Sequence, residues 1–147
     1  MLDKSIIGKE FPEQVFEIEK GKIREFARAI GDKNPAFYDV EEAKKLGMES
    51  LAVPPTFPIL FAFAGGLLDK IAALKVDFTK MLHGGQEYEY FRPIKPGDIV
   101  TGKSVITNLI EKKTKGGFMD LIVMQTTYIN QDGLKVLKDT ATIVVQR

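Results

Sequence analysis

Three short segments of the sequence carry side chains that could perform acid–base chemistry or polarise a carbonyl group. The first, residues 31–39, places Asp32 and Asn34 between Gly31 and Pro35, directly after a predicted helix. A carboxylate and an amide are side chains that could carry chemistry. Asp and Asn next to Gly and Pro are also the usual residues of a tight turn, so both interpretations stand at this point.

The second segment leads into the most apolar stretch of the chain. Pro54 and Pro55 fix an extended approach, and Thr56 is the predicted N-cap of the helix that follows. Unpaired amides of Thr56, Phe57 and Ile59 at the start of that helix could stabilise negative charge on a carbonyl oxygen. Alternatively, the prolines only prevent the helix from extending backwards.

The third segment, residues 82–93, contains His83, which is the single histidine of the chain. Histidine is the only side chain whose ordinary pKa suits proton transfer near neutral pH. A histidine beside Gly84 at the start of a strand can equally serve as a hydrogen-bonding residue of the fold. Glu87 and Glu89 share one face of this strand and are predicted to be solvated.

Composition excludes several classes of chemistry. The 147 residues include no cysteine, which rules out thiolate zinc sites, iron–sulfur clusters and a cysteine nucleophile, and one histidine cannot build a multi-histidine metal site. We therefore expect no metal and no cofactor. The net charge of +1 gives no general attraction to nucleic acid or to anionic membranes. The longest apolar run, residues 57–68, is shorter than the roughly 20 residues of a membrane span, and no signal peptide is evident, so we expect a cytoplasmic protein.

Hydrophobic periodicity predicts one α+β domain over residues 1–147, with an antiparallel sheet of about five strands around a long central helix. Such a sheet leaves an edge uncovered, so a dimer is expected. The predicted elements are strand 13–19, helix 20–30 capped by Gly31, short helix 40–46, central helix 57–74, and strands 85–91, 99–112, 118–130 and 134–146.

Gly65 and Gly66 lie inside the predicted central helix. Each glycine costs about 1 kcal/mol relative to alanine in a helix. Two explanations remain open: a neighbouring strand packs closely here, or an acyl chain lies along the helix.

Together, these segments resemble the MaoC-like dehydratase/hydratase family, and more closely its FAS1-type (N-terminal MaoC-like) branch. The resemblance implies a hot-dog fold and the reversible addition of water to a 2-enoyl thioester of coenzyme A or acyl carrier protein. It covers nearly the whole chain and depends on the order of several fragments: Gly31-Asp32-Lys33-Asn34-Pro35, Leu46-Gly47-Met48, Val53-Pro54-Pro55-Thr56-Phe57, Leu82-His83-Gly84, Phe91-Arg92-Pro93-Ile94 and Pro96-Gly97-Asp98.

The resemblance also assigns roles. In catalytic members the motif is Gly-Asp-x-Asn-Pro-x-His, so Asp32 matches the acid/base carboxylate and Asn34 the orienting amide. The motif histidine falls on Phe37, which cannot transfer a proton, as in the non-catalytic subunits of two-chain dehydratases. His83 could replace it if both residues face one cleft. We place Phe37, Pro55, Thr56, Phe57, Gly65 and Gly84 in the predicted substrate-binding set.

Three functions follow from these expectations. The first is a lyase, a (3R)-3-hydroxyacyl-thioester dehydratase or (R)-specific enoyl thioester hydratase, active alone or as the substrate-binding partner of a catalytic MaoC-like subunit. The second is a homodimeric acyl-CoA-binding protein without chemistry, and the third is a hot-dog thioesterase. The sequence leaves open the acyl chain length, the carrier, the direction of reaction and the choice between homodimer and heterodimer.

Overall fold

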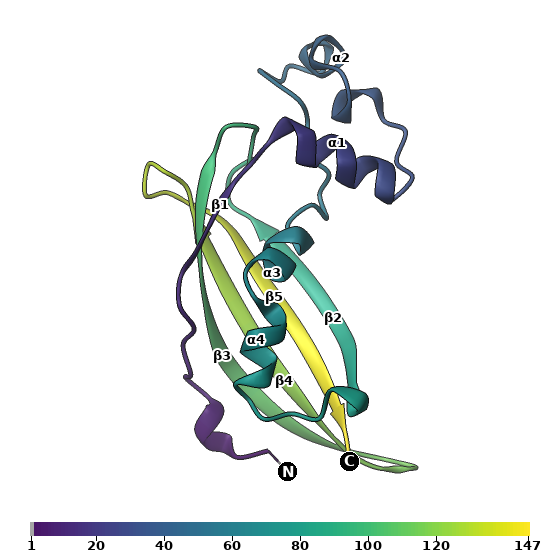
Figure 1. Cartoon of the computed structure of the whole chain (residues 1–147), viewed down its shortest axis with the longest axis vertical. Coiled ribbons are helices and arrows are strands. Elements are labelled where there is room, and N and C mark those ends of the chain that lie inside the picture. The colour runs from purple at the N-terminus through teal and green to yellow at the C-terminus, as the bar shows by residue number, and fades with distance from the viewer. Residues whose placement is uncertain (1) are drawn as a thin grey trace.

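A computed structural model describes residues 2–147, which form one curved antiparallel sheet with helices on one of its faces (Figure 1). The strand order is β1-β3-β4-β5-β2, so β3, β4 and β5 form a meander and β2 closes one edge beside β5. The α+β prediction is confirmed. The strands are β1 (Gln14–Glu17), β2 (Met81–Tyr90), β3 (Ile99–Thr114), β4 (Gly117–Ile129) and β5 (Lys135–Gln146).

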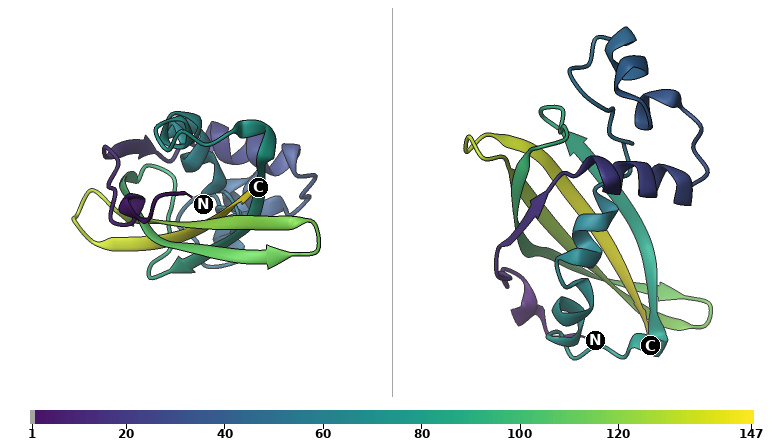
Figure 2. Two further views of the ribbon diagram at one scale, coloured as in Figure 1. Left: turned by 90° about the horizontal axis from the view of Figure 1, so that it is seen from below. Right: turned by 45° about the horizontal axis from the view of Figure 1, so that its top comes forward.

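Helices α3 (Ile59–Ala64) and α4 (Leu67–Ala72) lie end to end along one face of the sheet, as the right view in Figure 2 shows. Their buried faces, with the segments beside them, complete two apolar clusters against the inward side chains of the strands. This is the hot-dog arrangement, with helix inside a curled sheet. One cluster contains Phe57, Phe61, Val100, Tyr128 and Leu137, and the other contains Ile71, Leu74, Ile106, Ile122 and Ile143.

The prediction of one continuous helix over residues 57–74 is wrong, because the helix breaks at two glycines. Gly66 has a φ of 69°, in the left-handed region that favours glycine, and it starts α4. A Cβ on Gly65 would lie 2.7 Å from the carbonyl oxygen of Phe61 and 3.2 Å from Cζ of Phe16. The structure thus packs β1 closely against this break.

The segment between β1 and α3 forms a helical lobe, residues 20–52, beyond one end of the sheet (Figure 1). Its first helix ends at Gly31, whose φ of 71° confirms the predicted left-handed cap. The helices are α1 (Lys20–Ala29), the short η2 (Pro35–Phe37) and α2 (Val40–Lys45), while η1 (Lys4–Ile6) and η3 (Phe78–Lys80) lie outside the lobe. None of the helices found in residues 2–147 is long and apolar enough to span a bilayer.

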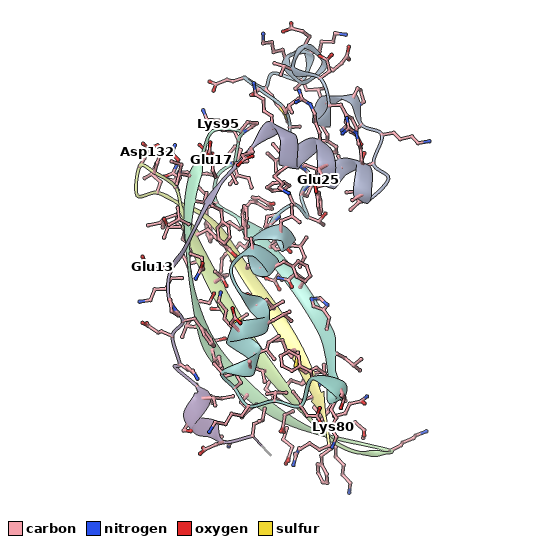
Figure 3. The ribbon with its side chains drawn as sticks, in the orientation of Figure 1. Glu13, Glu17, Glu25, Lys80, Lys95 and Asp132 are labelled. Atoms are coloured by element: carbon pink, nitrogen blue, oxygen red, sulfur yellow. The ribbon has the colours of Figure 1, made fainter. Side chains whose placement is uncertain are left out.

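Charged side chains mark the rim of the sheet. Lys95 and Asp132 extend from the loops at the end of the sheet nearest the helical lobe, and Lys80 lies near the opposite end (Figure 3). Glu13 and Glu17 follow β1 along the outer edge. The inward face of the sheet, by contrast, is lined mainly by apolar side chains.

A β-bulge in β2 changes which side chains face the helices. His83 pairs with Ile143 and Gly85 pairs with Thr142, so Gly84 is an extra residue without a partner in β5. His83 and Gln86 are three positions apart, and a regular strand would direct them to opposite faces. Because the bulge adds one residue between them, both side chains reach the helix-covered face.

We expect Gly84→Ala to lower the free energy of unfolding by about 1–3 kcal/mol, as overpacked sites do. The added Cβ would lie 2.6 Å from Cγ2 of Val144, inside van der Waals contact. Urea denaturation measures the change. Gly85→Ala is the matched control, since its Cβ meets nothing within 4 Å, and equal losses in the two variants would contradict this account of the bulge.

Candidate functional site

The segment that carries Asp32 and Asn34 folds as two successive capping turns. One carboxylate oxygen of Asp32 accepts the backbone N–H of Asn34 at 2.9 Å, and the side-chain oxygen of Asn34 accepts that of Ala36 at 3.1 Å. The hydroxyl of Tyr38 donates to the carbonyl of Asp32. Both predicted catalytic side chains therefore stabilise the local backbone, and Asn34 is exposed.

Phe37, at the position of the family histidine, is core rather than cavity wall. Its side chain is 6% exposed. It belongs to an apolar cluster made almost entirely of alanines from the helical lobe: Ala27, Ala36, Ala43 and Ala52. The cluster fixes η2 against α1 and α2, and it offers no group that transfers a proton.

The start of α3 does not present the free amides predicted for it. The N–H of Phe57 donates to the carbonyl of Pro54 at 2.9 Å, and the N–H of Ile59 donates to that of Thr56 at 3.1 Å. That prediction is therefore wrong for Phe57 and Ile59, because a tight turn precedes the helix and uses these groups. The predicted N-cap is also wrong, since Pro58 takes that position without a side-chain cap.

The remaining residues of this segment have separate places. Phe57 is buried and packs edge-on against Phe26 of α1, with ring centroids 5.7 Å apart. Pro55 lines a second, larger and more open pocket together with residues 47–53 and 93–95, and its carbonyl accepts the hydroxyl of Tyr90 at 2.7 Å. Burial raises the pKa of Tyr90 to about 12, so this phenol is a neutral donor.

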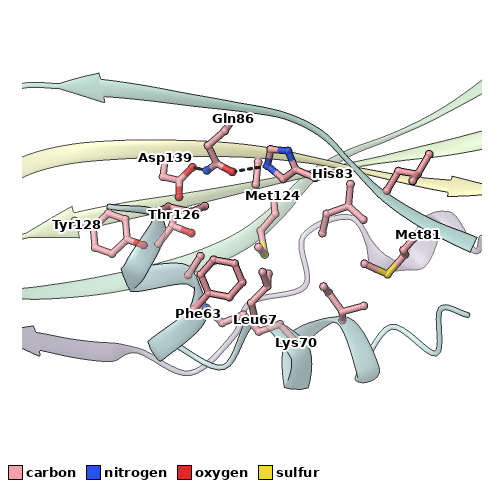
Figure 4. Close-up of a pocket in the computed structure, with 16 residues that line it drawn as sticks. Phe63, Leu67, Lys70, Met81, His83, Gln86, Met124, Thr126, Tyr128 and Asp139 are labelled. Carbon is pink, nitrogen blue, oxygen red and sulfur yellow. Dashed lines mark hydrogen bonds between the residues drawn. The ribbon is translucent and has the colours of Figure 1, made fainter. Parts of the chain in front are cut away.

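A mostly apolar cavity lies between α3–α4 and the inward face of the sheet (Figure 4). Its volume is about 120 Å³, and most of its wall is apolar. It contains His83 together with polar residues that the sequence analysis did not select. The lining residues are Ile59, Ala62, Phe63, Leu67, Lys70, Ile71, Met81, Leu82, His83, Gln86, Met124, Thr126, Tyr128, Asp139, Ala141 and Ile143.

A hydrogen-bonded relay crosses one wall of this cavity, from His83 through Gln86 to Asp139 (Figure 4). The side-chain amide of Gln86 donates to Oδ1 of Asp139, which fixes its Oε1 toward Nε2 of His83 at 3.0 Å. Because Oε1 only accepts, Nε2 of His83 carries the hydrogen. The carboxylate thereby orients the imidazole through one intervening amide.

Asp139 is the buried charge of the site, with 3% of its surface exposed. Desolvation raises its pKa to about 6, against the opposing effects of the hydrogen bond from Gln86 and the charges of His83 and Lys70. Burial likewise lowers the pKa of Lys70, whose ammonium donates to Oγ of Ser104 at 3.0 Å. A carboxyl group in an apolar wall with a pKa near neutrality suits proton transfer or ligand recognition.

The structure brings His83 together with Asp139 and not with Asp32. Over residues 2–147, every residue that lines the cavity comes from Ile59 or later, so the turn that holds Asp32 contributes nothing to it. Gly84 shapes the bulge behind the cavity, and Gly65 lies against Phe16 on the other side of the helix break.

A sequence signal for Asp139 exists in the alternation of β5. The inward positions of this strand carry Leu137, Ala141, Ile143 and Val145, and Asp139 interrupts that series as its one charged member. A charge at a core-facing position is rarely tolerated without a partner or a function. Gln86 gave no comparable signal, because its direction depends on the bulge.

Comparison with known proteins agrees with this fold. Residues 5–139 match the family described as FAS1-like, dehydratase domain region. The UPF0336 protein of Streptomyces coelicolor is 41% identical over 107 residues, covering 71% of each chain, and that of Thermobifida fusca is 33% identical over 99% of this chain and 94% of its own. The HadBC (3R)-hydroxyacyl-ACP dehydratase complex of Mycobacterium tuberculosis contains a chain that superposes with a TM-score of 0.80 at 27% identity, covering 95% of this chain and 96% of that one.

We expect Asp139→Asn to stabilise the protein at pH 7.5 and not at pH 4. The folded-state pKa of about 6 exceeds the ordinary 3.8, so this carboxyl supports folding while protonated, and that contribution is lost as the pH rises from about 4 through about 6. Two pKa units correspond to about 3 kcal/mol at most, and the bond from Gln86 becomes weaker when its acceptor is neutral, so we expect a gain of roughly 1–2 kcal/mol.

Urea denaturation at several pH values tests this expectation as the difference between the variant and the wild type. Asp132→Asn makes the same chemical change on an exposed turn and is the control. A difference for Asp139→Asn that stays constant between pH 4 and pH 7.5 would contradict the raised pKa.

Proposed function

Since this chain belongs to the FAS1-like, dehydratase domain region family, we propose that it is the acyl-thioester-binding subunit of a (3R)-3-hydroxyacyl-thioester hydro-lyase. A second chain of the same fold supplies the acid–base pair. The ligand is an acyl thioester of coenzyme A or acyl carrier protein. In this arrangement the chain contributes a cavity for the acyl group and a surface for the catalytic partner.

The observation that carries the proposal is the environment of Phe37. The family motif requires a histidine there, and this chain instead buries a phenyl ring among alanines. General acid–base assistance is worth about 10²–10⁴-fold in rate, so a chain with only Asp32 of the pair lacks most of the catalytic apparatus. The use of the Asp32 carboxylate in a turn supports the same conclusion.

The cavity between α3–α4 and the sheet supports the acyl-binding part of the proposal. Its walls are apolar over most of their area and its long side follows α3 and α4, which suits an alkyl chain. Burial of each methylene group contributes about 0.8 kcal/mol, so even a short chain would gain substantial affinity there.

Exposed apolar side chains around the cavity support the partner. Phe63 and Leu68 are 64% and 63% exposed on the helices, and Leu82 is 54% exposed on β2. β2 is also an edge strand of the sheet, and such edges are usually covered. Among solved structures of similar chains, HadBC is a (3R)-hydroxyacyl-ACP dehydratase complex.

The chemistry divides between the two chains. In dehydration, a base removes the proton at C2 of the 3-hydroxyacyl thioester while an acid protonates the departing 3-hydroxyl, giving a 2-enoyl thioester and water. The partner's Asp/His pair performs both proton transfers. This chain holds the acyl group so that C2 and C3 stay at that pair, and such positioning lowers the entropic part of the barrier.

We expect the purified chain alone not to hydrate crotonyl-CoA. Addition of a MaoC-type subunit that carries Gly-Asp-x-Asn-Pro-x-His should raise turnover at least about 100-fold above that of this chain alone, in line with the value of an acid–base pair. Loss of enoyl absorbance measures the reaction. Turnover by this chain alone that disappears in Asp32→Asn would overturn the proposal, and release of free thiol from acyl-CoA would indicate a thioesterase instead.

We also expect that Phe37→His does not create a hydratase. An imidazole among Ala27, Ala36 and Ala43 would lack a hydrogen-bond partner, so the free energy of unfolding should fall by about 2–4 kcal/mol. Phe37→Leu, which keeps the site apolar, is the matched control and should cost less. Hydration of crotonyl-CoA by folded Phe37→His would show a latent catalytic pair and contradict this assignment.

A further inference from the structure

Asp139 is an unusual residue in the lining of a mostly apolar cavity, because its side chain carries a carboxylate. Its neighbours across the sheet are Tyr88 on β2 and Thr126 on β4, and its side chain faces the helices rather than solvent. In the view along the cavity, Asp139, Thr126 and Tyr128 lie together at one end and Met81 lies at the other (Figure 4). A ligand that fills this space therefore meets one polar end and one apolar end.

The charged and titratable groups around Asp139 come from α4, β2 and β4. Within residues 2–147 none of them forms a salt bridge with its carboxylate. α4 contributes Lys70, whose ammonium is held by Ser104 of β3. β2 contributes His83, which acts through Gln86, and also Tyr88. β4 contributes the Tyr128 hydroxyl, a phenol kept neutral because burial raises its pKa.

The hydrogen bonding of Asp139 is asymmetric. Oδ1 accepts from the amide of Gln86, while no donor within residues 2–147 reaches Oδ2. Figure 4 shows the second carboxylate oxygen directed away from Gln86, toward the interior of the cavity. An ionised oxygen that faces an apolar space is a strong hydrogen-bond acceptor, and leaving it without a donor is energetically unfavourable.

We propose that Asp139 is a specificity-determining residue that accepts a hydrogen bond from a hydroxyl group on the acyl chain. This inference depends on the proposed function, because it names the acyl groups that the cavity selects. A plain alkyl chain would leave Oδ2 without a hydrogen-bond donor, while Oδ1 keeps the bond from Gln86. A hydroxylated chain keeps that acceptor satisfied with a charge-assisted bond while its methylene groups fill the apolar end.

Lys70 and the relay of His83, Gln86 and Asp139 keep Oδ2 available for a hydroxyl group of the ligand. The bond between Lys70 and Ser104 holds the ammonium away from Oδ2, so the acceptor stays available. The amide of Gln86 occupies Oδ1 and fixes the plane of the carboxylate. His83, on the exposed side of the relay, supports Gln86 in turn. His83 is thus a positioning residue in this scheme.

The test compares the binding of three ligands of equal chain length: dodecanoyl-CoA, (R)-3-hydroxydodecanoyl-CoA and 12-hydroxydodecanoyl-CoA. Isothermal titration calorimetry is performed with the chain alone and with its complex with the catalytic subunit inactivated in its Asp/His pair. At pH 7.5 we expect at least one hydroxylated ligand to bind about tenfold tighter than dodecanoyl-CoA, which is the usual discrimination of one hydrogen bond to a charged group.

Variants of Asp139 separate recognition from general effects. Asp139→Asn should reduce the hydroxyl preference several-fold, and Asp139→Leu should reverse it, so that dodecanoyl-CoA binds tighter. Asp132→Asn, the same change on the exposed β4–β5 turn, should keep the wild-type preference. Circular dichroism confirms that each variant is folded, and Asp139→Leu provides the test if Asp139→Asn does not fold.

The pH dependence gives an independent readout. Protonation of Asp139 below about pH 6 removes the charge, so the ratio of the affinities should fall between pH 7.5 and pH 5 in the wild type and stay flat in Asp139→Asn. Binding of all three ligands without preference would overturn this inference and leave the acyl-binding function in place. Absence of binding by any of them would overturn the proposed function itself.

Discussion

The polar part of the cavity depends on one extra residue in β2. Without the bulge at Gly84, the two-residue period of a strand would place His83 and Gln86 on opposite faces of the sheet. The amide that orients the Asp139 carboxylate would then face away from it. Glycine is needed at this position because Cγ2 of Val144 on β5 occupies the space of a Cβ. The lack of a Cβ at Gly84 thus permits the bulge that brings His83 and Gln86 to the same cavity wall.

Much of the fold could be predicted from the sequence, because most elements carry strong local signals. Alternation and turn residues placed β3, β4 and β5 within two residues of their observed ends, and Gly31 ends α1 as expected. The helix over residues 57–74 was predicted as continuous because its apolar residues repeat without interruption. Its break at Gly65–Gly66 depends on contact with Phe16, a residue of β1 that sequence spacing alone does not bring there.

The candidate site was predicted less well, for a related reason. Residue types pointed to Asp32 and Asn34, but the same types build capping turns, and only the hydrogen bonds show that use. His83 was selected as a possible acid–base residue, and the structure places it in the cavity wall. The carboxylate linked to it is Asp139, more than fifty positions away in sequence and brought near by the pairing of β2 with β5. Asp139 itself interrupts an apolar alternation, which is a signal visible in the sequence.

Asp32 and Asp139 have opposite effects on the stability of the fold. Asp32 is partly exposed and caps a turn, a role that adds to local stability. Asp139 stands where Leu137 and Ile143 continue the core, and ionisation there opposes folding above about pH 6. A capping hydrogen bond gives Asp32 a role in local folding, whereas the packing of β5 gives no such role to a charge at Asp139. Asp139 lowers stability when it is ionised, and its free oxygen faces the space that a ligand would fill, so ligand binding explains this residue better than packing does.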